Sequence, residues 1–257
     1  MADVIAPPLS GLGLLVTGGS SGIGRAIAVA CARAGADVIL TYLTDEEGAR
    51  ETERQIQGLG RLVSVIQCDV ADPSSVRALS QAVPQALGRI DVWVNNAGAD
   101  ILTGPGAALT DLEKLDRLLA VDLRGTMIAS WQAAELLGAQ EQGGVIINMS
   151  WDHALTGMPG RNPELFAAVK GGVLAFSKSL ARSLAPRVRV NVIAPGWIET
   201  SFAADVDERR RRAIADSTPL KRWGTPDDVA GAAVFLASPA AAFLTGQIIC
   251  VGGGVVM

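Results

Sequence analysis

Apolar and polar positions follow two alternating spacings along the chain. Short, mainly apolar runs are followed by longer segments in which apolar residues recur at helical spacing. Several short runs are continuously apolar, as expected for strands that are covered on both faces. The predicted strands are 12–17, 38–42, 62–67, 90–95, 144–150, 188–194 and 247–252.

The segments between these strands have the length and pattern of helices. Helices are expected at about 23–34, from Asp45 onward, and at about 74–87, 111–139, 164–185 and 226–237. Strands that alternate with helices predict an α/β fold, in which a parallel sheet carries helices on both faces. Because no linker or repeat interrupts the pattern, residues 1–257 are expected to form a single domain.

Three stretches do not fit a regular element. Residues 151–163 are polar and rich in glycine and proline, and residues 197–224 contain a charged helical segment that starts at Asp205. Both follow predicted strands, and in open α/β sheets ligands bind beyond the carboxyl ends of the strands. Together with residues 99–110, these stretches are predicted to be the substrate loops.

Composition and charge exclude several classes of protein. The chain is 49% apolar and its net charge is −4, which excludes intrinsic disorder and argues against binding to nucleic acid. We interpret the arginine run 209–212 as a solvated helix face. No apolar run is long enough for a membrane span, and the first residues do not have the pattern of a signal peptide. Three scattered cysteines and a single histidine predict free thiols in the cytoplasm and no metal site.

A glycine-rich segment connects the first predicted strand to the first helix. Residues 17–24 read Thr-Gly-Gly-Ser-Ser-Gly-Ile-Gly. Glycines allow a tight turn and let a pyrophosphate approach the amide groups at the helix start, where the helix dipole favours an anion. This position predicts a nucleotide-binding loop.

Further motifs follow this loop in a characteristic order. They are NNAG (95–98), AAVKGG (167–172), PGWIET (195–200), LKRWGTPDDVA (220–230) and FLTGQIICVGGG (243–254). In this order they resemble the short-chain dehydrogenases/reductases, above all the branch with β-ketoacyl carrier-protein reductases and glucose dehydrogenases. The resemblance covers essentially the whole chain. It implies a Rossmann-type, doubly wound sheet, a nicotinamide dinucleotide, a small-molecule substrate and assembly into a homotetramer or homodimer.

The resemblance also implies which residues contact the dinucleotide. The implied contacts are Gly18, Ser20, Ser21, Gly22, Ile23 and Gly24 at the pyrophosphate, Tyr42, Asp69 and Val70 at the adenosine half, Asn95, Ala97, Gly98 and Lys170 at the ribose, and Pro195, Gly196, Ile198 and Thr200 at the nicotinamide. An acid at the tip of the second strand would select NAD, but Tyr42 stands there. The arginine or lysine that often clamps a 2′-phosphate is also missing before Gly22, although Arg25 is one turn further on. Because the acid that would repel the phosphate is absent, NADP(H) is favoured over NAD(H).

The chain departs from the family at the proton relay of Asn, Ser, Tyr and Lys. Lys170 is present, but Phe166 replaces the tyrosine and Asp122 replaces the asparagine. Counting from the preceding strand places Ser150 or Trp151 at the serine, whereas counting back from Phe166 places His153 there. Gly252 also stands where many relatives keep an aspartate.

These departures change the expected chemistry. A phenylalanine cannot protonate an alkoxide, whereas a carboxylate stabilises a cation such as a protonated imine. We therefore expect hydride transfer to C=N, with Asp152 or His153 supplying the proton and Asp122, Lys170 and Ser150 completing the catalytic set. Trp151, Phe166 and Trp197 are predicted to line the substrate pocket. Two alternatives are a carbonyl reductase or alcohol dehydrogenase that uses Asp152 or His153, and a pseudoenzyme or assembly subunit that binds only the nucleotide.

Overall fold

The seven predicted strands form one parallel sheet. The computed structural model describes residues 6–204 and 206–257; residues 1–5 of the chain start and Asp205 lie outside this part. The strands are β1 (Gly13–Val16), β2 (Asp37–Tyr42), β3 (Val63–Gln67), β4 (Val92–Asn95), β5 (Gly144–Met149), β6 (Val188–Pro195) and β7 (Ile248–Val251). Their order is β3-β2-β1-β4-β5-β6-β7, and every neighbouring pair is parallel. The predicted α/β, doubly wound fold is confirmed.

The strand order explains where ligands bind. The chain runs outward from β1 to β3 and then crosses back to β4, so β1 and β4 are neighbours at the centre. The carboxyl ends of both strands, with the loops that follow them, lie at this switch point. The central strands are fully buried, which fits their continuously apolar sequence.

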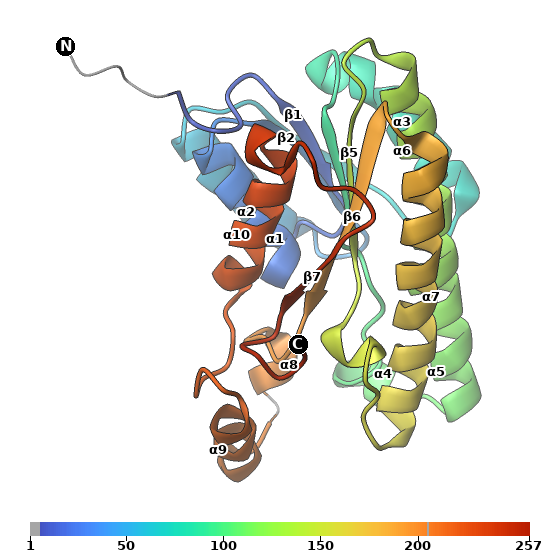
Figure 1. Ribbon diagram of the computed structural model, residues 1–257, viewed down its shortest axis with the longest axis vertical. Coiled ribbons are helices and arrows are strands. Elements are labelled where there is room, and N and C mark those ends of the chain that lie inside the picture. The colour runs from blue at the N-terminus through green and yellow to red at the C-terminus, as the bar shows by residue number, and fades with distance from the viewer. Residues whose placement is uncertain (1–5, 205) are drawn as a thin grey trace, which may run out of the picture.

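Helices cover both faces of the sheet (Figure 1). On one face lie α1 (Gly22–Arg33), α2 (Glu46–Gly58) and α10 (Pro226–Ala237); on the other lie α3 (Pro73–Leu87), α6 (Thr126–Ala139) and α7 (Arg161–Leu184). Two apolar clusters fill the two interfaces, the first around Leu40 and Ile147 and the second around Ile39 and Trp93. Because neighbouring strand residues point to opposite faces, Ile39 and Leu40 belong to different clusters.

The helix expected over 111–139 is interrupted. The structure shows α5 (Asp111–Leu118), then a π-helical turn η1 (Leu119–Gly125), and then α6. A π-helical turn inserts residues into a helix and frequently marks a functional site. Here it carries Asp122, which is almost completely buried. The prediction of one regular helix is therefore corrected, and the irregular turn positions a charged side chain inside the protein.

The three predicted loops contain short helices. The stretch 99–110 contains α4 (Gly104–Ala107), and 197–224 contains α8 (Ser201–Ala204) and α9 (Glu208–Ser217). The prediction that 151–163 is irregular is wrong at both ends, because η2 (Asp152–Ala154) is a 3₁₀ turn and α7 begins at Arg161. Pro163 is compatible with this start, since proline is tolerated in the first turn of a helix.

Helix α9 is attached by few contacts. It buries none of its residues, and Asp207 caps its first turn. The indole Nε1 of Trp223 donates to the Arg211 carbonyl at 2.9 Å, and the Arg211 guanidinium lies 5.5 Å from the Trp223 ring centre. Arg211 also forms an ion pair with Glu199. Lys221 Nζ also donates to the Asp216 carbonyl at 2.6 Å, so a few polar side chains, with Arg211 and Trp223 foremost, attach this helix.

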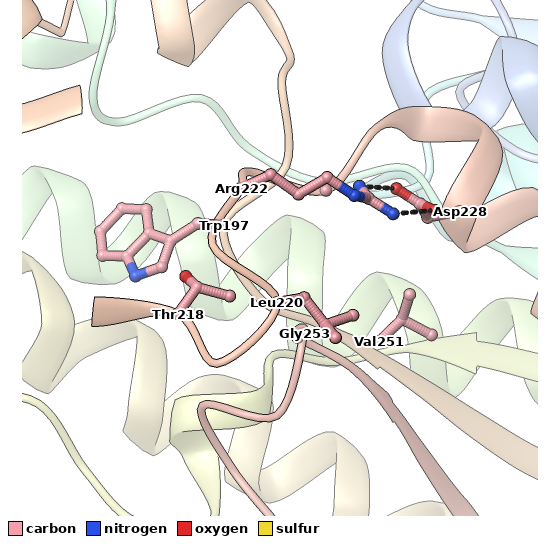
Figure 2. A pocket seen from close by; sticks show the side chains of 9 residues that line it. Trp197, Thr218, Leu220, Arg222, Asp228, Val251 and Gly253 are labelled. Carbon is pink, nitrogen blue, oxygen red and sulfur yellow. Dashed lines mark hydrogen bonds and ion pairs between the residues drawn. The ribbon is translucent and has the colours of Figure 1, made fainter. Parts of the chain in front are cut away.

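The start of α10 depends on Asp228. This carboxylate accepts two hydrogen bonds from Arg222, at 2.6 and 2.9 Å, which Figure 2 shows, and a third from the Thr225 amide at 2.7 Å. Thr225 and Asp228 form a capping box. The hydrogen bonds from Arg222, followed by the one from Thr225, lower the pKa of Asp228 well below its usual range.

We expect Asp228→Asn to lower the free energy of unfolding by about 1 kcal/mol at pH 7, since it removes an ion pair that is partly exposed and weakens a helix cap. A carboxyl group with a lowered folded pKa contributes stability above its unfolded pKa and loses it as the pH falls. The difference between wild type and variant should therefore be constant from pH 8 to pH 5 and shrink below about pH 4. Urea unfolding at each pH measures it, with Asp227→Asn on the same helical turn as the control. A difference that persists unchanged at pH 3 would contradict this account.

Candidate active site

The glycine-rich loop after β1 is packed too closely for side chains. A Cβ on Gly24 would lie 2.0 Å from the Gly18 carbonyl, and one on Gly18, whose φ is +67°, would lie 3.0 Å from Ala97 Cα. The amide of Asn96 donates its side-chain hydrogens to the Thr17 and Gly18 carbonyls at 3.0 and 3.1 Å. The loop is therefore bound to the segment after β4, with its amides at the start of α1, and this cradle fits a dinucleotide pyrophosphate.

Arg25 has a structural role at this loop. Its Nε donates to Thr52 Oγ1 at 3.0 Å, and its Nη2 donates to the carbonyls of Gly48, at 3.1 Å, and Ser20. These bonds tie the loop to α2. Ser21 is the N-cap residue of α1 and is exposed, and its hydroxyl makes no capping hydrogen bond.

The residues expected at the adenosine half lie at the ends of β2 and β3. Tyr42 is the last residue of β2 and is half-buried. Asp69 follows β3 and accepts a hydrogen bond from the Ala71 amide at 2.8 Å, and the buried Val70 packs beside η1. Asp45 stands after β2, but its carboxylate accepts from the Gly48 amide at 2.9 Å and caps α2.

The residues expected at the ribose and nicotinamide lie across from the glycine loop. A Cβ on Gly22 would lie 3.6 Å from Thr200 Cγ2, so the loop faces the segment 195–200 that follows β6. Asn95 is buried, and its amide donates to Ser130 Oγ at 2.9 Å and Asn148 Oδ1 at 2.8 Å. Asn95 therefore joins β4 to β5 and α6 through a buried network. Gly98 packs against Asp122, since a Cβ there would lie 3.1 Å from Oδ2.

Lys170 and Asp122 form a buried ion pair. Lys170 Nζ lies 2.8 Å from Asp122 Oδ2, and the other oxygen of Asp122 accepts from the Ala99 amide at 2.8 Å. Lys170 Nζ also donates to the Met149 carbonyl at 3.4 Å. The pair links η1, α7 and the segment after β4, so the ammonium group is fixed in direction before any ligand arrives.

Ser150, Trp151 and His153 were the candidates for the serine position, and their surroundings differ. Ser150 is buried, and its hydroxyl donates to the Lys170 carbonyl at 3.0 Å, so it is held against α7. Asp152 is fully buried, and its Oδ1 lies 2.6 Å from both the amide nitrogen and the ring Nδ1 of His153. Trp151 stacks on the His153 ring at 5.0 Å. The structure therefore joins Asp152 to His153 and Asp122 to Lys170, and the site does not present two free carboxylates.

Aromatic rings surround His153. Trp151 lies between His153 and Phe166, whose ring centre is 6.2 Å away and turned edge-on. Trp197, which follows β6, meets the His153 ring at 6.3 Å in a T-shaped contact and contacts Trp223 at 5.7 Å. Trp197 also borders a cavity of about 90 Å³, which Figure 2 shows between the segment 218–224 and the end of β7. Two of the expected pocket residues, Trp151 and Trp197, thus contact the imidazole, and the third, Phe166, contacts Trp151.

Sequence reasoning missed several residues of this site. The side chains of Thr17 and Asn96 hold the glycine loop, and Trp223 extends the aromatic cluster. Thr17 and Asn96 lay inside recognised motifs, so their motif positions were the available signal. Among the described residues, no three His, Cys, Asp or Glu side chains group in a way that could hold a metal ion.

Comparisons with known proteins show which family this chain resembles. Residues 18–256 match the family model described as enoyl-(acyl carrier protein) reductase. The chain is 36% identical over 252 residues to 3β-hydroxysteroid dehydrogenase 1 of Eggerthella lenta, covering 97% of this chain and 95% of that protein. A 7α-hydroxysteroid dehydrogenase solved with NADH and 7-oxo glycochenodeoxycholic acid is 30% identical, with a TM-score of 0.88 over 98% of this chain and 96% of that one. A blue fluorescent protein from a metagenomic library, solved with NADPH, is 34% identical, with a TM-score of 0.85 over 97% of this chain and 100% of that one.

The family match extends over nearly the whole chain, and the related structures share its sheet and its helices. The chain therefore belongs to the short-chain dehydrogenases/reductases, a family of nicotinamide-dependent oxidoreductases.

Proposed function

We propose that this protein is an NAD(P)H-dependent reductase that transfers hydride to the C=N bond of a small molecule, and that its proton comes from the loop after β5. The observation that carries this proposal is Phe166, which lies where the family keeps its acidic tyrosine and packs edge-on against Trp151. A ring without a hydroxyl donates no proton. The nearest titratable pair in this aromatic cluster is Asp152 with His153.

An imine suits these groups better than a ketone. The nitrogen of an imine is much more basic than a carbonyl oxygen, so a weak acid such as an imidazolium is sufficient to protonate it. The resulting iminium is a flat cation, and the faces of Trp151 and Trp197 stabilise such a cation by about 0.5–2 kcal/mol each. Lys170 adds little opposing charge, because Asp122 neutralises it at 2.8 Å.

Each group of this chain then has a defined task. A bound reduced nicotinamide supplies the hydride. Lys170 is oriented by Asp122 to hold the ribose hydroxyls, while the glycine loop binds the pyrophosphate. His153 or Asp152 moves the proton, and Trp151, Phe166 and Trp197 exclude water from the reacting bond.

Carbonyl reduction is the second candidate. The relatives include two proteins named hydroxysteroid dehydrogenases, and one of them was solved with a 7-oxo steroid. The Asp152–His153 pair, 2.6 Å apart, is also a reasonable acid for a developing alkoxide. A protein that binds the dinucleotide and transfers hydride to neither substrate would be the pseudoenzyme.

We further propose that NADP(H) is favoured over NAD(H). Tyr42, not an acid, ends β2, and the Asp45 carboxylate is engaged with the Gly48 amide as the cap of α2, so the acid that would accept from the ribose 2′-OH is missing from the strand tip. Arg25 does not offer its full guanidinium, because it is tied to Ser20, Gly48 and Thr52. The related structures hold NADH in one case and NADPH in the other. The preference should therefore be small.

Assembly into a homodimer or homotetramer is proposed through the face of α5, η1 and α6. This face exposes apolar side chains, namely Leu112 (73%), Leu119 (39%) and Trp131 (49%). No helix in the described part of the chain is long and apolar enough to cross a membrane. The cytoplasm is the proposed location, since Cys31, Cys68 and Cys250 are free thiols.

The substrate class is tested by Phe166→Tyr. We expect the phenol to raise kcat/KM for a cyclic ketone about tenfold or more and to leave that for the cyclic imine of the same ring size unchanged. Oxidation of NADPH is followed by absorbance, with Phe243→Tyr, which lies fully exposed, as the control. A wild type that is inactive on imines while the tyrosine variant reduces them would refute C=N reduction.

The cofactor preference is tested by Ser21→Arg. The added cation lies at the start of α1 beside the β2 end, and we expect it to lower the Kd for NADPH about tenfold, roughly 1.4 kcal/mol, and to change that for NADH little. Fluorescence titration of both dinucleotides measures the ratio, with Ser183→Arg on the last turn of α7 as the control. A wild type that binds NADH more tightly than NADPH would reverse the proposed preference.

Assembly is tested by Leu119→Glu. A charge within the apolar face should convert the assembly to smaller species, because burying it without a partner costs several kcal/mol. Light scattering after size exclusion gives the mass, and Leu59→Glu, which is also 39% exposed, is the matched control. A monomeric wild type at micromolar concentration would contradict the proposal.

A further inference from the structure

The carboxylate of Asp152 is bonded at one oxygen only. Oδ1 accepts from the His153 amide and lies 2.6 Å from His153 Nδ1. Oδ2 is buried and has no hydrogen-bond partner within the described residues. Leaving a buried oxygen unsatisfied costs about 1–3 kcal/mol, and more for a charged group. A buried carboxylate oxygen without a partner therefore calls for an explanation, such as a role in positioning another group.

Two glycines make room for this carboxylate. A Cβ on Gly252, just after β7, would lie 2.2 Å from Asp152 Oδ2, and one on Gly196, just after β6, would lie 2.6 Å from the same atom. Neither glycine is among those with positive φ, whereas Gly253 and Gly254 are. Glycine is therefore required at 196 and 252 by space and not by backbone conformation. We call this pair the glycine socket.

The glycine socket also accounts for the missing tail aspartate. The Asp152 carboxylate occupies the space that a side chain at 252 would need, so no aspartate fits at 252 while Asp152 keeps this position.

The socket fixes the chemistry of the His153 ring. Asp152 Oδ1 takes the hydrogen on Nδ1, so the other ring nitrogen, Nε2, remains for exchange with a ligand. Trp151 stacks on the ring at 5.0 Å and Trp197 meets it at 6.3 Å in a T-shaped contact, so both indoles restrict how the ring turns. The side chain is 12% exposed, which leaves a narrow approach.

We propose that His153 is the catalytic proton donor, acting through Nε2, and that Asp152, held in the glycine socket of Gly196 and Gly252, is its positioning residue. This inference rests on the proposed reductase function and decides which member of the pair donates. It also assigns a role to Gly196 and Gly252, which leave room for the Asp152 carboxylate.

In the proposed step, His153 protonates the imine before hydride reaches its carbon. The Nε2–H bond of the imidazolium breaks and an N–H bond forms on the imine, which leaves His153 neutral with its remaining proton on Nδ1. The iminium carbon then forms a C–H bond with the hydride, and the C=N π pair becomes the lone pair of the amine. A bound reduced nicotinamide would supply the hydride with its two electrons, and a proton taken up from the solution would restore Nε2–H.

The charges around Asp152 favour this direction. Burial raises the pKa of Asp152, while its bonds to His153 oppose that shift. Asp152 in turn acts on Cys250 of β7, whose pKa is raised first by burial and then by Asp152. A buried carboxylate is costly without a counter-charge, so the contact with His153 at 2.6 Å holds Asp152 in this place.

Nuclear magnetic resonance reads this ring directly, because His153 is the single histidine of the chain. In protein labelled with nitrogen-15 histidine and free of cofactor, we expect the neutral wild-type ring to carry its proton on Nδ1. Asp152→Asn, which keeps the number of heavy atoms and removes the negative charge, should shift the ring toward the Nε2–H tautomer. Gly252→Ala should do the same by displacing Asp152, and Gly231→Ala, whose Cβ would meet nothing within 4 Å, should leave the spectrum unchanged.

Turnover provides the second readout. We expect His153→Ala to lower kcat about 100-fold or more, and Asp152→Asn and Gly252→Ala to lower it about 10- to 100-fold, with the Kd for NADPH unchanged. A wild-type neutral ring protonated on Nε2, or a Gly252→Ala protein with wild-type spectrum and kcat, would overturn the proposal. If circular dichroism shows that Gly252→Ala does not fold, the spectrum and kcat of Asp152→Asn test the proposal on their own. A wild type inactive on both imine and ketone would refute the reductase function, while the spectra would still decide the role of Asp152.

Discussion

Close approach between backbone segments at the carboxyl edge of the sheet is the constraint on which the site depends. Because the seven strands are parallel, the loops that follow them converge at one edge. There, a Cβ on Gly24 would lie 2.0 Å from Gly18, and one on Gly252 would lie 2.2 Å from Asp152. The first contact shapes the nucleotide cradle and the second places the acidic loop. Both halves of the site thus depend on missing side chains as much as on present ones.

Charge burial is handled by pairing. Lys170 and Asp122 bind each other at 2.8 Å, and Asp152 binds His153 at 2.6 Å, all with little exposure. Buried pairs contribute little net stability, but losing one partner costs about 3–5 kcal/mol. An aspartate at 122, in place of the family's asparagine, therefore commits Lys170 to a neutralised role. The second pair is the one to which we assign the proton step, and the rings of Trp151 and Trp197 contact its imidazole.

The sequence predicted the fold well and the site in part. Strand positions and the glycine loop follow from local signals, namely apolar runs and glycine spacing, which neighbouring residues determine. The π-helical turn at 119–125 and the helix start at Arg161 were missed, because composition there resembles that of a regular helix or of a loop. Lys170 and Asp122 were identified as candidates, but their pairing required the packing of η1 against α7. The orientation of Asp152 depends on Gly252, which is distant in the chain, so no local pattern revealed it.

Helix α9 differs from the rest of the fold in how it is attached. It buries none of its residues, and Trp223 and Glu199 hold it mainly through Arg211. Segments with little buried apolar surface open at low free energy, without loss of the core. Amide hydrogens in α9 should therefore exchange with solvent through local opening, whereas those of β4 and β5 require global unfolding. Helix α9 and the central strands thus belong to different cooperative units, so α9 opens without loosening the sheet.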